Sequence, residues 1–384
     1  MMNRPVSAVA RPAAAIPADQ LMELPPANLY RQAFDEIGKV EHISASPQRE
    51  PTLRFWMEVC EARLAAMSPE HCATIFRKLT KLGVKNGTNF DKWLERMLPE
   101  CGDISVYGLS GIAMFFARKK EREHLPLIFS AAQDQLNNPN KQTLEDCIGK
   151  TARGYGRLVY AAAEVQCTEG LDLAALQDVL IKNIHLLSFQ DGCLISRSFC
   201  TLGMDEFLAN YAKYLRSNTP PKSEIMVRPV SQLYQAAAAS ALIDELPLEL
   251  VQTARDEIPN QKKFVERHVS RFEEKVAERF KEIGGEKIIV HKQFEKDGFF
   301  ADLLLQDASD RNRCVIVECD GDRYHLTRDG ESRLGKDKLK ERYFGEICGI
   351  PTQSIFYQEW NSLTPTTQDR LIQDIIFNHF KVKV

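Results

Sequence analysis

A helix start recurs at nearly regular intervals along the first half of this chain. Ser68, Ser105, Thr143 and Ser188 are separated by 37, 38 and 45 residues. A Ser or Thr hydroxyl at such a position accepts hydrogen bonds from the free amides of a helix's first turn. Apolar residues three and four positions apart follow each start, which predicts an amphipathic helix.

A second helix is predicted in each interval, over residues 89–98, 125–136, 173–184 and 204–215. Two helices per period of about 38 residues are typical of an α-solenoid, in which each unit buries its apolar face against its neighbours. Residues 28–39 and 53–66 fit a further, degenerate unit. The alternative is an ordinary helical domain with chance spacing. Residues 27–255 are thus predicted to form an α-helical repeat array.

The segment before this array, residues 1–26, is rich in Ala and Pro and has no acidic residue before Asp19. Its prolines interrupt the continuous apolar stretch that a secretory signal peptide requires. The composition favours a flexible tail. An organelle transit segment and the export signal of a bacterial effector remain alternatives.

The pattern changes in the last third of the chain. A long charged helix is predicted over residues 262–283, followed by strands at 287–294, 299–305, 313–318 and 352–356. Further helices are predicted at 336–348 and 367–380. This order predicts a small α/β domain over residues 256–384. The predicted fold class is therefore α + α/β, an amino-terminal α-solenoid of helical-hairpin repeats followed by a small α/β domain.

Polar residues gather where these strands end. Asp302 lies in the second strand, and the third ends in Glu318-Cys-Asp320-Gly321, with His325 shortly after. With the later Glu359-Trp360, this order resembles the RAP domain, over about residues 262–365. The core of that domain is similar to very-short-patch-repair endonucleases and the wider PD-(D/E)xK nuclease fold. RAP domains follow helical repeats in FAST kinase-like and octotricopeptide repeat proteins of mitochondria and chloroplasts, so the resemblance implies a role in RNA processing or stability.

Carboxylates at adjacent strand ends suit a divalent cation that activates water. Asp302, Glu318 and Asp320 are candidate ligands of Mg²⁺ or Mn²⁺ and, with His325, candidate catalytic residues of an endoribonuclease. The usual nuclease motif ends Glu-x-Lys, and Asp320 stands in place of that lysine. The alternatives are a nuclease-derived fold that only binds RNA and requires no cofactor, and a strand end kept for its turn geometry.

RNA binding by overall charge is excluded, because 50 basic and 53 acidic residues leave a net charge of -3. Binding must instead depend on locally sorted basic residues. Varied side chains after each helix start are candidate base-reading positions, for example Glu70, Tyr107, Glu145 and Asp191. The candidate phosphate contacts are Arg77, Lys78, Arg118, Lys119, Lys120, Arg153, Arg157, Arg197, Arg323, Lys336 and Lys340.

The leading hypothesis is sequence-selective binding of single-stranded RNA. A scaffold that holds a peptide in its helical groove, in one form a secreted bacterial effector, is a further alternative. No apolar run reaches the roughly 18 to 20 residues of a membrane-spanning helix, which predicts a soluble protein without a membrane partner. Ten scattered cysteines suit a reducing compartment, cytoplasmic or organellar, or a host cell if the protein is secreted.

Overall fold

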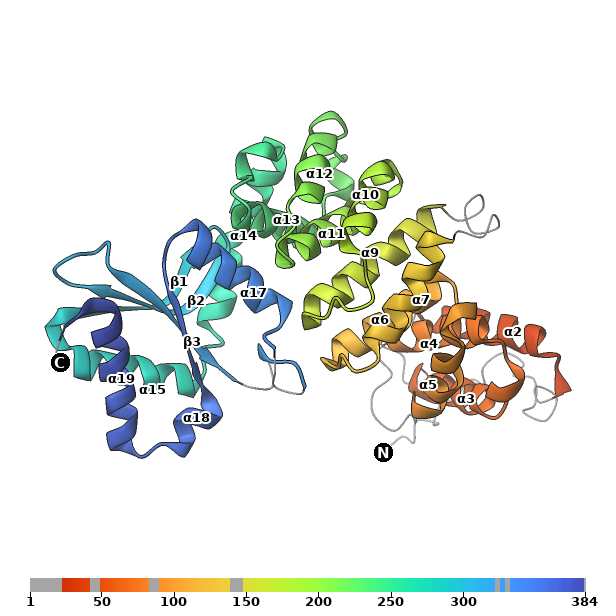
Figure 1. Cartoon of the computed structure of the whole chain (residues 1–384), viewed down its shortest axis with the longest axis horizontal. Helices are drawn as coiled ribbons and strands as arrows, with labels where there is room; N and C mark the ends of the chain where they lie inside the picture. The colour runs from red at the N-terminus through yellow and green to blue at the C-terminus, as the bar shows by residue number, and fades with distance from the viewer. Residues whose placement is uncertain are drawn as a thin grey trace, which may run out of the picture. The chain divides into compact units, whose positions relative to one another are not determined.

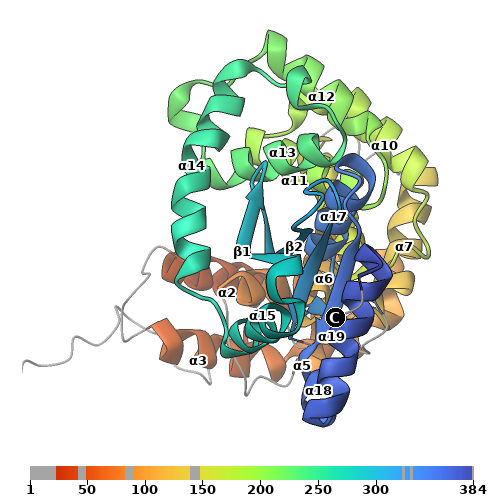
Figure 2. The ribbon, with the colours of Figure 1, turned by 90° about the vertical axis from the view of Figure 1, so that its left-hand side faces the viewer.

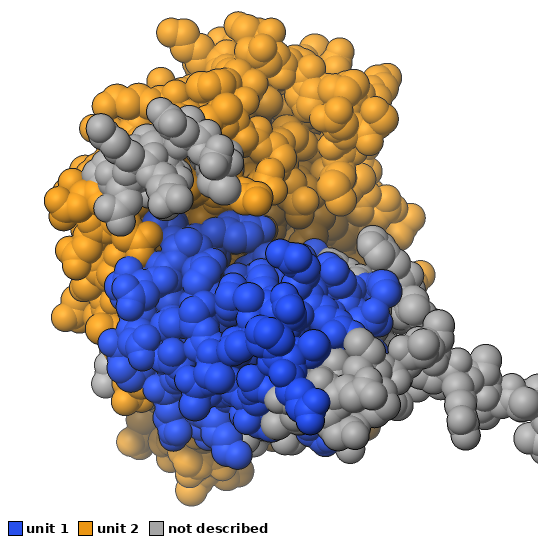
Figure 3. All heavy atoms as spheres, turned by 90° about the vertical axis from the view of Figure 1, so that its right-hand side faces the viewer, with its two compact units in different colours: residues 1–112 blue, residues 113–384 orange. Residues whose placement is uncertain are grey.

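The computed structural model describes residues 23–41, 49–82, 90–138, 148–321, 325–328 and 332–382. The chain forms two compact units, residues 1–112 and 113–384 (Figure 3). Along the sequence, a helical region precedes a small α/β domain, as predicted. Within the described ranges, no helix is both long and apolar enough to cross a membrane. Residues 1–22 of the predicted tail and the predicted helix start at Thr143 lie outside these ranges.

Unit 1 is built from helices α2 (Pro26–Glu41), α3 (Arg49–Glu61), α4 (Pro69–Lys81), α5 (Phe90–Met97) and the first half of α6 (Val106–Lys119), with 3₁₀ helices at Leu64–Ala66 and Leu98–Asp103. The predicted cap of α4 is confirmed, because the Ser68 hydroxyl accepts a hydrogen bond from the His71 amide. The apolar stripe of α4, which includes Ile75 and Phe76, is fully buried. Contacts with α2 and α5 cover this stripe.

The helices of unit 2 are α7 (Leu125–Asn137), α9 (Ile148–Val165), α10 (Leu173–Lys182), α11 (Phe189–Thr201), α12 (Glu206–Ser217), α13 (Val227–Ala239) and α14 (Leu248–Glu266), with 3₁₀ helices at Ile184–Leu186, Lys222–Glu224 and Ile243–Glu245. Ser188 caps α11 as predicted. Helices α9, α11 and α13 pack side by side, and α10 and α12 form an outer row (Figure 2). Close packing requires Gly192, since a Cβ there would lie 2.2 Å from the Tyr211 ring.

The α/β domain contains α15 (Arg271–Gly284), β1 (Ile288–Lys296), β2 (Phe299–Asp307), β3 (Cys314–Asp320), α17 (Gly335–Arg342), β4 (Thr352–Phe356), α18 (Tyr357–Ser362) and α19 (Pro365–Phe380). A π-helical turn, Tyr343–Ile347, continues α17, and a 3₁₀ turn, Gly285–Lys287, precedes β1. The sheet order is β1-β2-β3-β4, and only the β3–β4 pair is parallel. A parallel pair needs a crossover, which α17 supplies. The predicted order of elements is confirmed.

The single long helix predicted over residues 262–283 is wrong. The chain leaves α14 after Glu266 and begins α15 at Arg271. Ser270 caps α15 by accepting from the Glu273 amide, and the Glu273 side chain accepts in return from the Ser270 amide. This reciprocal capping box favours a new helix start, whereas the charge pattern runs unbroken across it. The predicted domain boundary at residues 255/256 falls inside α14 and stays a prediction.

The two faces of the sheet have different coverings (Figure 1). Alternate residues of β2 and β3, among them Leu303 and Val317, belong to an apolar core with α15 and α19. Trp360 from α18 lies in the same core. Because side chains alternate along a strand, the intervening residues of β2 and β3 point to the opposite face, where α17 packs.

Helix α17 also attaches the α/β domain to the helices of unit 2, through contacts with α9, α11 and α13. Arg342 holds the Asp205 carboxylate with two hydrogen bonds, at 2.8 and 2.5 Å. Just beyond α17, the Tyr343 hydroxyl donates to Asp297 at 2.5 Å, and Tyr234 of α13 donates to the same carboxylate. The α/β domain and these helices therefore form one packed body.

The backbone of α17 packs tightly against α9 at Gly335, so we expect Gly335→Ala to destabilise unit 2 by roughly 1–3 kcal/mol. A Cβ at this position would lie 2.4 Å from the Ala163 carbonyl oxygen. The matched control is Gly345→Ala, whose Cβ would meet no atom within 4 Å. Urea unfolding of the full chain measures both variants. Equal stability of the two would contradict this account of the contact.

Candidate functional site

Two carboxylates, Asp302 and Glu318, stand opposite each other on the two central strands. The register pairs Leu303 of β2 with Val317 of β3, so Asp302 and Glu318 occupy the next position along. The Asp302 Oδ2 accepts a hydrogen bond from the Cys319 amide at 2.7 Å. Glu318 is only 2% exposed. Two neighbouring acids with so little solvent require a cation or a proton between them.

Lys340, from α17, supplies that cation. Its Nζ lies 2.7 Å from Glu318 Oε2 and donates a further hydrogen bond to the Phe300 carbonyl at 3.2 Å. A lysine thus reaches the acidic pair from the helix, although Asp320 occupies the motif position where a nuclease carries lysine. The structure gives Lys340 a different partner from the RNA phosphate that the sequence predicted.

The protonation of this cluster is shifted strongly. Burial raises the pKa of Asp302 to about 6 and that of Glu318 to about 7, although the Lys340 charge acts in the opposite direction. Burial acts to lower the pKa of Lys340, but the two acids outweigh it and raise this pKa above its usual value. Within the described part of the chain, the buried Glu318 Oε1 has no hydrogen-bond partner. This oxygen can take a proton or bind a further cation.

Asp320 and His325 belong to a separate charged network. Arg333 pairs with Asp320 and also donates to the Ser354 hydroxyl. His325 Nδ1 lies 3.3 Å from Asp320 Oδ1 and 3.2 Å from Asp337 Oδ1. Burial alone would raise the pKa of Asp337, but the His325 hydrogen bond and charge hold it below its usual value. These contacts tie the end of β3 to the first turn of α17.

The three predicted metal ligands are therefore not gathered into one set. Across the ranges that the structure describes, no group of three or more His, Cys, Asp or Glu side chains is placed to hold a metal ion. Asp320 is occupied by Arg333 and His325. Asp302 and Glu318 still offer oxygen atoms of the kind that Mg²⁺ and Mn²⁺ prefer. A metal role for these two residues stays a prediction.

The predicted phosphate contacts in unit 1 have partners within that unit. Arg77 donates to the Tyr107 hydroxyl at 3.1 Å, and its guanidinium lies 4.3 Å from the centre of the Tyr107 ring. Lys78 donates to the Phe34 carbonyl at 2.7 Å and lies over the Phe34 ring. Both side chains thus stabilise helix packing, which leaves them less available to a nucleic-acid backbone.

The candidate base-reading positions are likewise used inside the protein. Glu70 accepts hydrogen bonds from both the amide and the hydroxyl of Ser105, at 2.7 and 2.9 Å, and so fixes the start of α6. In unit 2, Asp191 forms an ion pair with Arg153, another predicted phosphate contact, across α9 and α11. Glu145 lies outside the described residues, as does Arg323.

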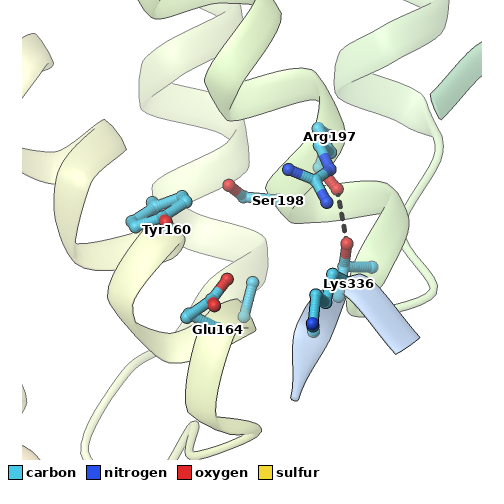
Figure 4. Close-up of a pocket in the computed structure, with 8 residues that line it drawn as sticks. Tyr160, Glu164, Arg197, Ser198 and Lys336 are labelled. Atoms are coloured by element: carbon cyan, nitrogen blue, oxygen red, sulfur yellow. Dashed lines mark hydrogen bonds between the residues drawn. The ribbon is translucent and has the colours of Figure 1, made fainter. Parts of the chain in front are cut away.

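Other predicted basic residues gather at a small pocket between α9, α11 and the start of α17 (Figure 4). Its polar lining includes Tyr160 and Glu164 of α9, Arg197 of α11 and Lys336 of α17. Figure 4 shows the charged groups of Glu164, Arg197 and Lys336 on different sides of this space. Among the described residues, none of these three charged groups has an ion-pair or hydrogen-bond partner.

The electrostatics show which other cations share the surroundings of this pocket. Burial and the Glu164 charge raise the pKa of the Tyr160 hydroxyl, and the charges of Arg197, Arg118 and Arg228 oppose them. Burial lowers the pKa of Arg197 despite Glu164. Burial also lowers the pKa of Lys120, and the charge of Lys336 adds to this effect. The charges of arginines from α6, α11 and α13 thus act on one tyrosine, and Arg197 and Lys336 line the pocket beside it. We call this group, Arg118, Lys120, Arg197, Arg228 and Lys336, the cationic cluster.

Two other predicted contacts lie nearby in sequence but are not part of the cluster. Lys119 is exposed at the end of α6, and Arg157 is half-buried on α9. Sequence analysis missed Tyr160, Glu164 and Arg228. The first two stand four residues apart on α9, which places them on one face, but no sequence signal brings Arg228 to them.

No protein-family model and no curated protein matches this sequence. The resemblance to RAP domains therefore stays a prediction.

Proposed function

We propose that this protein binds single-stranded RNA selectively, through a helical-repeat region assisted by a RAP-like α/β domain, and acts in RNA processing or stability. The observation that carries the proposal is the cationic cluster: Arg197 of α11 and Lys336 of α17 line one pocket, and the charges of Arg118 of α6 and Arg228 of α13 act on the Tyr160 hydroxyl there. The chain as a whole carries a net charge of -3. A polyanion is therefore attracted to such sorted positions and not to the protein at large.

The layering of the helices supports an elongated binding surface. Helices α9, α11 and α13 pack side by side, as the first helices of solenoid repeats do. The pocket that Arg197 and Lys336 line lies where α9 and α11 meet the start of α17. Tyr160 adds an aromatic ring among the basic groups, a combination that suits single strands, since unpaired bases stack on aromatic side chains.

We expect the double variant Arg118→Glu/Arg228→Glu to bind single-stranded RNA at least about tenfold more weakly than the unchanged protein, because phosphate contacts dominate such affinities. Both residues are exposed, so the fold is expected to persist. Fluorescence anisotropy with a pool of labelled single-stranded RNA, at several salt concentrations, measures the affinity. Circular dichroism checks the fold.

The matched control for that experiment is Lys182→Glu/Lys213→Glu, which changes the net charge equally on the outer helices α10 and α12. This variant is expected to bind nearly as well as the unchanged protein. If both double variants weaken binding equally, the cationic cluster is not the binding surface. If the unchanged protein retains no RNA at low salt, the proposed function is wrong.

A second candidate function, metal-dependent cleavage of RNA, is favoured by one observation in the α/β domain. In the part of the chain that the structure describes, the buried Glu318 Oε1 has no hydrogen-bond partner, and the pKa values of Glu318 and of the neighbouring Asp302 are raised. Asp302 and Glu318 would hold Mg²⁺ or Mn²⁺, which supplies an activated water and stabilises the charged transition state. Cleavage of the same RNA pool that depends on added metal and is lost in Asp302→Asn would favour this candidate. Binding unchanged by that substitution would favour a domain without chemistry.

A further inference from the structure

The pocket at the start of α17 has the features of a phosphate site. Helix α17 begins after Leu334, whose side chain provides no cap. The first backbone N–H groups of a helix have no partner within it, and they attract anions. The Asp337 amide bonds to the Leu334 carbonyl at 3.0 Å. Gly335 and Lys336 both line the pocket, and among the described residues no hydrogen bond uses the amide of either.

Two cations face the same space. Arg197 and Lys336 line the pocket, and within the described residues neither side chain has an ion-pair partner. Burial lowers the pKa of Arg197, so its charge is maintained at a cost. A ligand with one negative charge would compensate this cost and also accept hydrogen bonds from these two amides, which have no partner among the described residues.

Glu164 sets the pocket apart from a simple anion site. Its carboxylate lines the same space and, in the part of the chain that is described, has no partner. A carboxylate repels a second anion but accepts a hydrogen bond from a hydroxyl group. The lining therefore suits a ligand that carries a single negative charge next to a hydroxyl. In an RNA chain, each phosphodiester adjoins a ribose whose 2′-hydroxyl distinguishes it from DNA.

We propose that this pocket takes one phosphodiester group of RNA on Arg197, Lys336 and the amides of Gly335 and Lys336, while Glu164 accepts a hydrogen bond from the adjoining 2′-hydroxyl. The inference rests on the proposed function and adds to it a site that selects RNA over DNA. Tyr160, beside Glu164, provides a ring against the same nucleotide. Because α9, α11 and α17 all contribute, the site exists only where the α/β domain contacts these helices.

The test compares RNA and DNA strands of the same sequence on the full-length protein. The unchanged protein is expected to prefer RNA by about tenfold or more, the size of a hydrogen bond to a charged group. In Glu164→Leu, RNA affinity is expected to fall by about tenfold while DNA affinity holds or rises, so that the preference disappears. Arg197→Met is expected to weaken both strands by a similar factor.

A change on the ligand side keeps the test independent of folding. RNA with 2′-O-methyl groups is expected to bind the unchanged protein like DNA. Inorganic phosphate, used as a competitor, separates a site for free anions from one for the RNA backbone, and displacement of RNA by low millimolar phosphate would contradict the proposal. Preference for RNA that persists in Glu164→Leu would overturn this site. The same result leaves the proposed function intact if Arg118→Glu/Arg228→Glu still weakens RNA binding.

Discussion

Replacing Lys340 with methionine is expected to lower the free energy of unfolding by roughly 3–5 kcal/mol, since it leaves buried acids without their counter-ion. Glu318 is 2% exposed and the Lys340 side chain 18% exposed, so little water reaches the pair. With the ammonium removed, Asp302 and Glu318 face each other across β2 and β3 with no cation between them. Methionine keeps the length of the side chain, so the loss reflects mainly the charge.

A double variant tests that explanation. Removing the orphaned charge as well, in Lys340→Met/Glu318→Gln, is expected to recover most of the lost stability. The matched control is Lys338→Met on the same helix, where the lysine is 41% exposed and pairs with Glu341, which is 45% exposed. Such an exposed pair contributes about 0–1 kcal/mol. Urea unfolding of all three variants decides the question. A Lys338→Met variant as unstable as Lys340→Met would contradict the burial argument.

The group of Asp302, Glu318 and Lys340 also illustrates which parts of the site the sequence can predict. The placement of Asp302 and Glu318 on neighbouring strands follows from strand alternation and from the short β2–β3 connection, both local signals. The partner of Glu318 does not follow in the same way, because Lys340 reaches it from a crossover helix. Sequence alone placed Lys340 among basic residues around a nucleic-acid backbone. The helix packs that lysine inward.

The helices show the same contrast between local and tertiary signals. Ser68 and Ser188 mark their helices correctly because a capping hydroxyl acts within one turn. The helix break before Ser270 also has a local signal, the capping box of Ser270 and Glu273, but the charged residues continue across it and favoured one long helix. Pairs such as Arg77 with Tyr107 arise between helices and have no sequence signature. Basic residues on a helix therefore cannot be assigned to phosphate until their neighbours are known.

The metal hypothesis also depends on tertiary contacts that the sequence pattern does not show. The three predicted ligands, Asp302, Glu318 and Asp320, belong to two networks, because Asp320 pairs with Arg333 and His325. Two acids and a lysine remain at the centre of the sheet, with one oxygen unpartnered among the described residues. With a proton on the Glu318 carboxyl group, this arrangement is stable without a metal ion. It also leaves the same oxygen free for a cation, so protonation and metal binding compete for one atom.

This competition predicts how stability depends on pH. The pKa values of Asp302 and Glu318 are raised from 3.8 and 4.5 to about 6 and about 7 in the folded protein, so the folded state holds protons that the unfolded state releases. Stability is therefore expected to fall as the pH rises from about 4, near the unfolded pKa values, to about 7, near the higher folded one. The expected loss is roughly 3–6 kcal/mol, since a pKa difference of one is worth about 1.4 kcal/mol and each of the two coupled acids has its pKa raised by about two.

Other groups do not mask this trend. Lys340 has its pKa raised from 10.5, so its contribution stays constant until strongly alkaline pH. Burial lowers the pKa of His379, so this residue makes stability rise with pH near pH 6.5. Burial raises the pKa of Glu164, so Glu164 makes stability fall with pH, as Asp302 and Glu318 do. Unfolding in urea at several pH values, for the unchanged protein and for Asp302→Asn/Glu318→Gln, separates these contributions. In the double variant, stability is expected to decline much less as the pH rises. If it declines as in the unchanged protein, groups other than Asp302 and Glu318 cause the loss.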